Sequence, residues 1–268
     1  MSRLQKTSET IELIRISGDQ WMIVEDVVVK EQPLTIHING HEWITLLCTW
    51  QSVDFLVAGF LYSEGLIRNK EDILSLQIND EEGKVRVETR DQEGFQGILK
   101  GKRTITTGCG KGTVFYDVLD ALTSKPVAGQ SMVNHHTILS ASAEFQKKSQ
   151  VFRETGGVHG CGLFDQSGLR LFHEDIGRHN ALDKIVGQIL LEGLSDQRLF
   201  LITSGRISSE MIIKAARIGV QIMVSRSAAT DLAIELAGQL NITLIGFARG
   251  DRMNVYTGGS RLSLLQDK

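Results

Sequence analysis

From about residue 150 onward, short apolar, β-branched runs alternate with amphipathic segments of about ten residues. This alternation restricts the fold more than any other feature, because strands alternating with helices form right-handed crossovers and parallel sheets. We therefore predict an α/β region with a largely parallel sheet. The expected strands are 160–164, 169–173, 199–203, 221–224, 242–247 and 254–257, and the expected helices are 138–148, 178–192, 208–217 and 230–239.

The first 90 residues predict a different kind of structure, because they are rich in β-branched residues. Asn39-Gly40 separates two such runs and predicts a tight hairpin, since both turn positions need a positive φ. Residues 53–63 predict a helix that Ser52 can cap. The expected strands are 11–16, 22–29, 34–38, 43–49, 73–78 and 84–89.

The glycine-rich segment 91–112 lacks periodicity and predicts a functional loop, followed by a short helix over 114–122. We therefore expect an α+β protein of two domains. A smaller β-rich N-terminal domain, residues 1–125, ends in this loop, and an α/β domain follows over 126–268. The sequence places the boundary between them only within about 110–150.

Composition excludes several classes of protein. The chain has 268 residues, a net charge of −3 and three cysteines, none of them in a C-x-x-C pair. These counts argue against a disulfide-stapled scaffold and a zinc ribbon. The pI near 6.2 gives no global attraction to nucleic acid. Neither a signal peptide nor a membrane-spanning run is recognisable, so we expect a cytoplasmic protein.

One cysteine has the surroundings of a reactive thiol. Cys109 lies between two glycines, in a stretch (98–113) that carries four basic residues and no acidic one. Nearby positive charge favours the thiolate, and glycines leave the sulfur accessible. A flexible basic loop with an incidental cysteine is the alternative. Cys48, in an apolar strand, is expected in the core. Cys161 is expected as a small residue in a tight strand, with a second reactive thiol as the alternative.

Four further clusters contain glycine, histidine or arginine at the ends of expected strands and helices. Residues 155–159 could form an anion-binding nest with His159 beside it, although a structural turn histidine fits equally well. Residues 174–184 place Arg178 and His179 in the first turn of a helix, where cations are unfavourable unless an anion is present. Residues 203–210 form another strand-to-helix turn. Residues 247–252 follow the last long strand with two arginines and a glycine, and arginines suit bidentate contacts to phosphate or guanine. A capped helix and solvated turns are the alternatives.

The sequence resembles the FdhD/NarQ family, the formate dehydrogenase accessory sulfurtransferases. The resemblance covers about residues 50–260 and rests on five blocks in the family's order. These blocks are AGFLYSEGLI (58–67), TTGCGKG (106–112), ETGGVHG (154–160), EDIGRHNALDKIVG (174–187) and SGRISSEM (204–211).

The resemblance implies a C-terminal domain with a cytidine-deaminase-like, three-layer fold and a homodimeric protein. It also implies that Cys109 receives sulfur from a cysteine desulfurase as a persulfide. The sulfur then passes to the molybdenum bis(molybdopterin guanine dinucleotide) cofactor that formate dehydrogenase needs. The cofactor is cargo, no metal is held directly by the protein, and neither nucleic acid nor a membrane is a partner. The family's cofactor-binding segment corresponds to 247–252.

We therefore predict Cys109 as the catalytic residue and a cofactor site built from the clusters above. The expected cofactor-binding residues are Gly156, Gly157, His159, Arg178, His179, Ser204, Gly205, Arg206, Phe247, Ala248, Arg249, Gly250, Asp251 and Arg252.

One position departs from the family pattern. Many members have a second cysteine where this chain has Gly112, so a resolving thiol in the same loop is absent. A non-catalytic cofactor carrier is therefore one alternative to a sulfurtransferase. A deaminase-like hydrolase is the other, although the P-C-x-x-C signature of zinc deaminases is missing.

Overall fold

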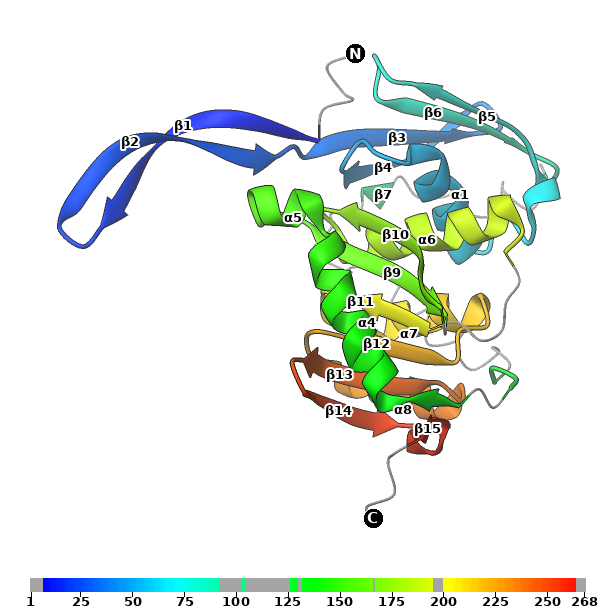
Figure 1. Cartoon of the computed structure of the whole chain (residues 1–268). Helices are drawn as coiled ribbons and strands as arrows, with labels where there is room; N and C mark the ends of the chain where they lie inside the picture. Colours follow the sequence, from blue (N-terminus) through cyan, green and yellow to red (C-terminus); the bar gives the residue numbers. More distant parts are fainter. Residues whose placement is uncertain are drawn as a thin grey trace.

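The computed structural model describes residues 7–91, 103–104, 126–129, 132–165, 167–194 and 200–263. These residues form a five-stranded sheet, a six-stranded sheet and two two-stranded sheets, with helices between and around them (Figure 1). The expected α+β class is confirmed. Within the described ranges, no helix is long and apolar enough to cross a membrane.

The six-stranded sheet has the order β10-β9-β11-β12-β13-β14. Only its centre is parallel: β11 pairs with β12 and β12 with β13 in parallel, whereas the other three pairs are antiparallel. The expectation of a largely parallel sheet was therefore wrong. Short turns join β9 to β10 and β13 to β14, and such turns allow only antiparallel pairing. The strands are β9 (His159–Asp165), β10 (Gly168–Asp175), β11 (Phe200–Thr203), β12 (Ile222–Ser225), β13 (Thr243–Arg249) and β14 (Arg252–Thr257).

Helices cover both faces of this sheet, because successive strand residues point to opposite faces. Leu201, Met223 and Leu244 pack under α6 (Arg178–Glu192), α7 (Ser209–Arg217) and α8 (Asp231–Gln239). Their neighbours along the strands, such as Ile202 and Val224, pack under α4 (His135–Lys148) on the other face. The result is a three-layer arrangement, as expected. The short α5 (Gln150–Thr155), which the sequence did not predict, follows α4.

The N-terminal sheet has the order β5-β6-β3-β4-β7. Every second residue of β3 from Leu34 onward is apolar and buried (Leu34, Ile36 and Ile38), and α1 closes this core. The predicted Asn39-Gly40 hairpin is confirmed, with φ of 50° and 81°. The elements are β3 (Gln32–Ile38), β4 (His41–Cys48), α1 (Val53–Ser63), η2 (Lys70–Asp72), β5 (Ile73–Asn79), β6 (Lys84–Thr89) and β7 (Arg103–Thr104).

Two glycines let α1 and α6 cross at close range between the two larger sheets (Figure 1). A Cβ built on Gly59 of α1 would lie 1.8 Å from the carbonyl oxygen of Asp183. One built on Gly187 of α6 would lie 1.9 Å from the carbonyl oxygen of Phe55. Any side chain at either position would collide with backbone, so this crossing fixes the two sheets relative to each other.

Three features differ from, or fall outside, the sequence predictions. Helix α1 begins after Ser52 as expected, but Ser52 has a φ of 52° and its side chain makes no capping hydrogen bond. The expected helix 114–122 and most of the expected loop 91–112 lie outside the described residues. The predicted domain division stays a prediction. The remaining strands are β1 (Ser8–Ser17), β2 (Gln20–Val29), β8 (Val133–Asn134) and β15 (Leu262–Ser263), with η3 (Gly259–Arg261) between β14 and β15.

Candidate functional site

The candidate site lies at one edge of the six-stranded sheet. The parallel strands β11, β12 and β13 all end at this edge, with Thr203 and Ser225 directly paired. At the same edge β10 ends at Asp175, which is paired with His159 at the start of β9. Ligands of α/β proteins bind outside the carboxyl ends of parallel strands. Four of the sequence clusters therefore meet where a ligand is expected.

His159 and Ser204 lie next to each other at this edge. The Ser204 hydroxyl lies 3.2 Å from Nδ1 of His159 and accepts a hydrogen bond from the backbone N–H of Gly160 at 3.0 Å. Burial, reinforced by Arg178, lowers the pKa of His159, so its imidazole is neutral at neutral pH. The loop after β11 is thereby held against the start of β9.

Arg178 lies directly over Gly205. A Cβ on Gly205 would lie 3.1 Å from both Cβ and Cδ of Arg178, so glycine leaves the space that this side chain occupies. The Nε of Arg178 is buried and has no hydrogen-bond partner among the described residues. Burial and the charge of Arg206 lower the pKa of Arg178. Two guanidinium groups beside a helix N-terminus, one with an unused buried donor, suit an anion such as phosphate.

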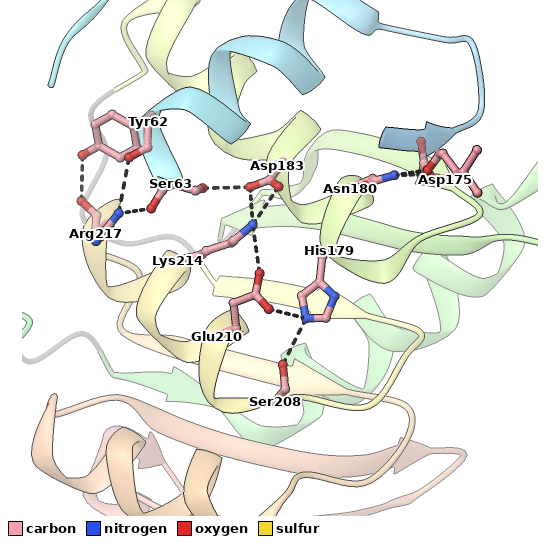
Figure 2. A network of polar contacts seen from close by, with 11 residues as sticks. Tyr62, Ser63, Asp175, His179, Asn180, Asp183, Ser208, Glu210, Lys214 and Arg217 are labelled. Atoms are coloured by element: carbon pink, nitrogen blue, oxygen red, sulfur yellow. Dashed lines mark hydrogen bonds and ion pairs between the residues drawn. The ribbon is translucent and has the colours of Figure 1, made fainter. Parts of the chain in front are cut away.

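His179 lies beside this pair of arginines, and one of its nitrogens is already engaged. Its Nε2 is 3.1 Å from the Ser208 hydroxyl and 3.4 Å from a carboxylate oxygen of Glu210 (Figure 2). Burial lowers the pKa of His179 to about 4 despite the opposing effect of Glu210. The ring is therefore neutral. A carboxylate at Nε2 favours the tautomer with its proton there, which leaves Nδ1 as a hydrogen-bond acceptor for a ligand.

Glu210 is the outer member of a series of charged contacts that continues through Lys214 to Asp183 (Figure 2). Lys214 Nζ lies 3.4 Å from Glu210 and 2.7 Å from Asp183, which also accepts a hydrogen bond from Ser63 of α1 at 2.8 Å. Burial lowers the pKa of Lys214, but the two carboxylates outweigh it, and the net pKa is raised. Burial raises the pKa of Glu210, yet Lys214 and His179 outweigh this and the net pKa is lowered. Glu210 is therefore ionised.

A second buried ion pair holds the start of α6. Lys184 Nζ lies 2.7 Å from Asp175, and it donates to the hydroxyl of Thr49 at 3.0 Å. Asp175 also accepts from the backbone N–H of Gly177 at 3.0 Å and from Asn180 at 2.9 Å. The sequence predicts Asp175 only as a helix cap. The structure adds that it joins the end of β4 to the helix that carries Arg178.

The segment 247–252 reaches the same edge through another arginine. Arg226, which follows β12, donates its backbone N–H to Thr203 at 3.1 Å, and its carbonyl accepts from Nε of Arg249 at 2.5 Å. Phe247 has a φ of 52° and is 38% exposed. A non-glycine residue in this strained conformation is typical of ligand sites. Of the other expected residues, Ala248 is buried and Gly250 forms the turn to β14 with a φ of 61°. Asp251 and Arg252 are exposed at this turn.

The two glycines of the expected anion nest have local roles. The N–H of Gly156 donates to Phe152 at 2.7 Å, and that of Gly157 donates to the Thr155 hydroxyl at 3.1 Å. A Cβ on Gly157 would lie 2.5 Å from Val29 of β2. Neither N–H is open to a ligand, so these glycines shape the chain before His159 and do not cradle an anion.

The two described thiols lie in the core. Cys48 and Cys161 are both fully buried, as expected. Burial raises the pKa of Cys48 to about 12, and burial together with Asp183 raises that of Cys161. A thiol that stays protonated in the core is a poor nucleophile, which disfavours Cys161 as a second reactive cysteine. Cys109 lies outside the described residues, and its role stays a prediction.

Six residues that the structure places at or behind the site were not among the predicted site residues: Asp175, Asp183, Ser208, Glu210, Lys214 and Arg226. Glu210 and Lys214 are four residues apart in a predicted helix, a spacing that predicts an ion pair. Arg226 follows a predicted strand of the parallel region, so the argument that selected Arg206 could have selected it too. No local pattern indicates that Asp183 and Lys214, which are 31 positions apart, form an ion pair.

Comparisons with known proteins agree on one family. The model of the FdhD/NarQ family matches residues 29–263. The sulfur carrier protein FdhD of Bacillus subtilis (strain 168) is 45% identical over 244 residues, covering 89% of this chain and 91% of that protein. That of Listeria monocytogenes serotype 4b (strain F2365) is 41% identical over 93% of this chain and 96% of that protein. A crystal structure of a formate dehydrogenase accessory protein from Desulfotalea psychrophila matches with a TM-score of 0.77 and 27% identity, covering 96% of this chain and all of that one.

Proposed function

Because this chain belongs to the FdhD/NarQ family, we propose that it is a sulfurtransferase that carries sulfur on Cys109 to the molybdenum cofactor of a formate dehydrogenase. The observation that carries the proposal is the meeting of Arg178, His179 and the Ser204–Arg206 turn at one sheet edge, within a family whose members are named sulfur carriers. Such an edge can hold the anionic cargo while the thiol delivers sulfur to it.

The sulfur-loading step requires a nucleophilic thiolate. The Cys109 sulfur attacks the terminal sulfur of a persulfide on a cysteine desulfurase. The S–S bond of the donor breaks, and the donor cysteine leaves as a thiolate while its terminal sulfur stays on Cys109. No net oxidation occurs. The basic residues near Cys109 in sequence, Lys102, Arg103 and Lys111, favour the anionic forms of both the thiol and the persulfide.

The cargo that we propose is the molybdenum bis(molybdopterin guanine dinucleotide) cofactor. Its phosphates suit Arg178 and Arg206, and the buried, unpaired Nε of Arg178 offers a donor for one of them. The exposed ring of Phe247 offers an apolar face on which a guanine can stack, with Arg249 beside it. The neutral ring of His179 offers an acceptor for a donor group of the ligand.

Persulfide labelling tests the sulfur part of the proposal. The full-length protein is incubated with a cysteine desulfurase and cysteine, and its peptides are analysed by mass spectrometry. The expected result is a gain of about 32 Da on the Cys109 peptide, absent from Cys109→Ser. Cys161→Ser is the matched control and should keep the gain. No gain on Cys109, with guanine nucleotide still bound, would instead favour a non-catalytic cofactor carrier, which the single loop cysteine makes the second candidate.

The proposal names three protein partners: a cysteine desulfurase as donor, formate dehydrogenase as recipient and a second copy of this chain. It places the protein in the cytoplasm, where thiols stay reduced. Activation of formate dehydrogenase in a strain lacking the protein tests the link to the enzyme. Full activation by Cys109→Ser would contradict the role of this thiol.

A further inference from the structure

Phe247, whose ring we assign to the base of the cargo, has a backbone conformation that needs support. Its φ is 52°, in the left-handed region that a residue other than glycine adopts only at a cost in free energy. The backbone is fixed on both sides of this residue. The N–H of Phe247 donates to the carbonyl of Ser227 at 3.0 Å, and the carbonyl of Ala248 accepts from the hydroxyl of Ser142 at 2.7 Å. The place of the ring therefore depends on two other segments of the chain.

Arg226 joins these two segments. It precedes Ser227 in the turn after β12, and its side chain reaches α4, which crosses one face of the six-stranded sheet (Figure 1). Its Nη1 donates to the hydroxyl of Ser142 at 3.0 Å and to the carbonyl of Ser142 at 3.2 Å, and its Nη2 donates to Gln146 at 2.7 Å. Because the Ser142 hydroxyl accepts from Arg226, its single proton is directed at Ala248. Arg226 thus fixes the hydrogen bond that holds the chain next to Phe247.

The side chain of Arg226 is already used within the protein, whereas that of Arg249 is not. The backbone carbonyl of Arg226 accepts from Nε of Arg249 at 2.5 Å. The Nη atoms of Arg249 make no hydrogen bond within the described part of the chain, so they can turn toward an anion. Burial, followed by the charge of Arg249, lowers the pKa of Arg226. Since both Nη atoms of Arg226 point to α4, a role in holding the segment fits this residue better than a role in binding phosphate.

The turn after β12 is also bonded to the anion side of the edge. The hydroxyl of Ser225 donates to the carbonyl of Gly205 at 2.7 Å and accepts from the N–H of Ser227 at 2.8 Å. Ser225 is fully buried, so water does not compete for these bonds. A continuous series of hydrogen bonds therefore runs from Gly205, over which Arg178 lies, through Ser225 and Ser227 to Phe247. This series fixes the separation between the anion turn and the aromatic ring.

We propose that Arg226 is a positioning residue of the ligand site: it holds Phe247 at a fixed place relative to the Gly205 turn, so that the base and the diphosphate of one guanine nucleotide bind together. This inference rests on the proposed function, which assigns the guanine to Phe247 and the phosphates to Arg178 and Arg206. A site that is ordered before the ligand arrives binds more tightly, because binding does not have to order it. Without Arg226 the diphosphate still meets its two arginines, but the base meets a ring that is no longer held in place.

Calorimetry with two probes separates positioning from direct contact. The full chain is titrated with guanosine diphosphate, which uses both the ring and the anion turn, and with inorganic pyrophosphate, which uses the anion turn alone. Arg226→Met should weaken binding of guanosine diphosphate at least about fivefold, the lower limit for one base–aromatic stack. Its affinity for pyrophosphate should equal that of the wild type. A parallel loss of pyrophosphate binding would mean that Arg226 contacts the phosphates itself, which contradicts the proposal.

Arg226→Lys distinguishes the geometry of the side chain from its charge. Lysine keeps the positive charge but lacks the planar fork that bonds Ser142 and Gln146 at once. This variant should therefore lose binding of guanosine diphosphate as Arg226→Met does, and binding at the wild-type level would refute the positioning role. Arg170→Met is the matched control, because Arg170 pairs with Asp165 at the other end of β9 and is 55% exposed. It should bind both probes as the wild type does.

A double-mutant cycle shows whether Arg226 acts through Phe247. Phe247→Ala should weaken binding of guanosine diphosphate by about 5–150-fold. Adding Arg226→Met should cause no further loss, because the ring that it positions is gone, and additive losses would rule out this coupling. Ser142→Ala serves if Arg226→Met does not fold. It removes only the bond to Ala248 and should weaken binding of guanosine diphosphate but not of pyrophosphate; unchanged binding of both probes would overturn the proposal.

Failure of this inference and failure of the proposed function give different results. A wild type that binds neither probe would overturn the proposed cargo site and the positioning role together. A wild type that binds guanosine diphosphate, with Arg226→Met and Ser142→Ala binding it equally well, would overturn the positioning role alone. Persulfide labelling of Cys109 in the wild type reports separately on the sulfur step.

Discussion

Lys214→Met should be among the most damaging single substitutions in the C-terminal domain. Lys214 and Asp183 are both buried and lie 2.7 Å apart. Removing one partner of a buried ion pair costs about 3–5 kcal/mol, because the other charge stays buried without compensation. At roughly 2–4 °C per kcal/mol, the thermal midpoint should fall by roughly 6–20 °C. Urea denaturation followed by circular dichroism gives the free energy of unfolding directly.

The loss of stability in Lys214→Met should also depend on pH, and the direction of this dependence follows from the pKa of Asp183. Burial already raises the pKa of this carboxyl, and Lys214 is the strongest effect that opposes burial. In the variant, the folded-state pKa is further above the unfolded value of about 3.9. The folded state then binds more protons than the unfolded state between these two values, so stability falls as pH rises through that window. The difference in the free energy of unfolding between Lys214→Met and the wild type should therefore become smaller as the pH falls toward about 4.

Two further variants make this reasoning refutable. Lys84→Met removes the same side chain from an exposed pair with Glu82, and it should leave the midpoint unchanged. Asp183→Leu combined with Lys214→Met should recover most of the lost stability, because an apolar pair can replace a buried ion pair. A loss below about 1 kcal/mol for Lys214→Met would refute the argument. So would a double variant that is less stable than the single one.

Three other predictions follow from the site and from the helix crossing. Long-range ¹H–¹⁵N spectra of the His179 imidazole should place its proton on Nε2 at neutral pH. Glu210→Ala should shift the tautomer toward Nδ1–H and lower the His179 pKa further, and an unchanged tautomer would contradict the role of Glu210. Arg178→Gln should weaken binding of guanosine diphosphate by about 10–100-fold in calorimetry, and equal binding would remove this arginine from the site. Gly59→Ala should lower the thermal midpoint although alanine favours helices, whereas Gly238→Ala on α8, with no atom nearer than 3.9 Å, should not.

Much of the fold could be predicted from local patterns. Helices α1 and α6 begin and end at the predicted residues, and the Asn39-Gly40 turn has the predicted conformation. These features depend on neighbours in the sequence. The antiparallel pairs β9–β10 and β13–β14 were predictable too, because a short turn joins each pair of strands. The antiparallel pairing of β9 with β11 depends instead on which distant strands meet, and short strands of mixed composition carry little information about that. The β1–β2 hairpin shows the limit most clearly, because its alternation predicts two strands but not that they pair only with each other among the described residues.

The candidate site was predictable in position and only partly in mechanism. Strand-to-helix turns selected Arg178, His179 and Arg206 correctly as neighbours, because the ends of parallel strands must share an edge. The anion nest failed at Gly157, where glycine is needed for packing against Val29 and its N–H is already used. A glycine-rich turn looks the same in sequence whether it approaches a ligand or another strand.

The two buried ion pairs connect the N-terminal sheet to the edge of the six-stranded sheet where the candidate site lies. Ser63 of α1 binds the Asp183–Lys214 pair, and Thr49, just after β4, binds the Lys184–Asp175 pair. Both N-terminal contacts reach helix α6, whose first turn carries Arg178 and His179. Strand β7 pairs in parallel with β4, and its last residue is five positions before Cys109. The chain thus enters the Cys109 segment from the sheet that is bonded to the start of α6. Uncharged contacts could hold the two sheets together, but a buried charge without its partner is costly, so these ion pairs hold the N-terminal sheet in one position against α6.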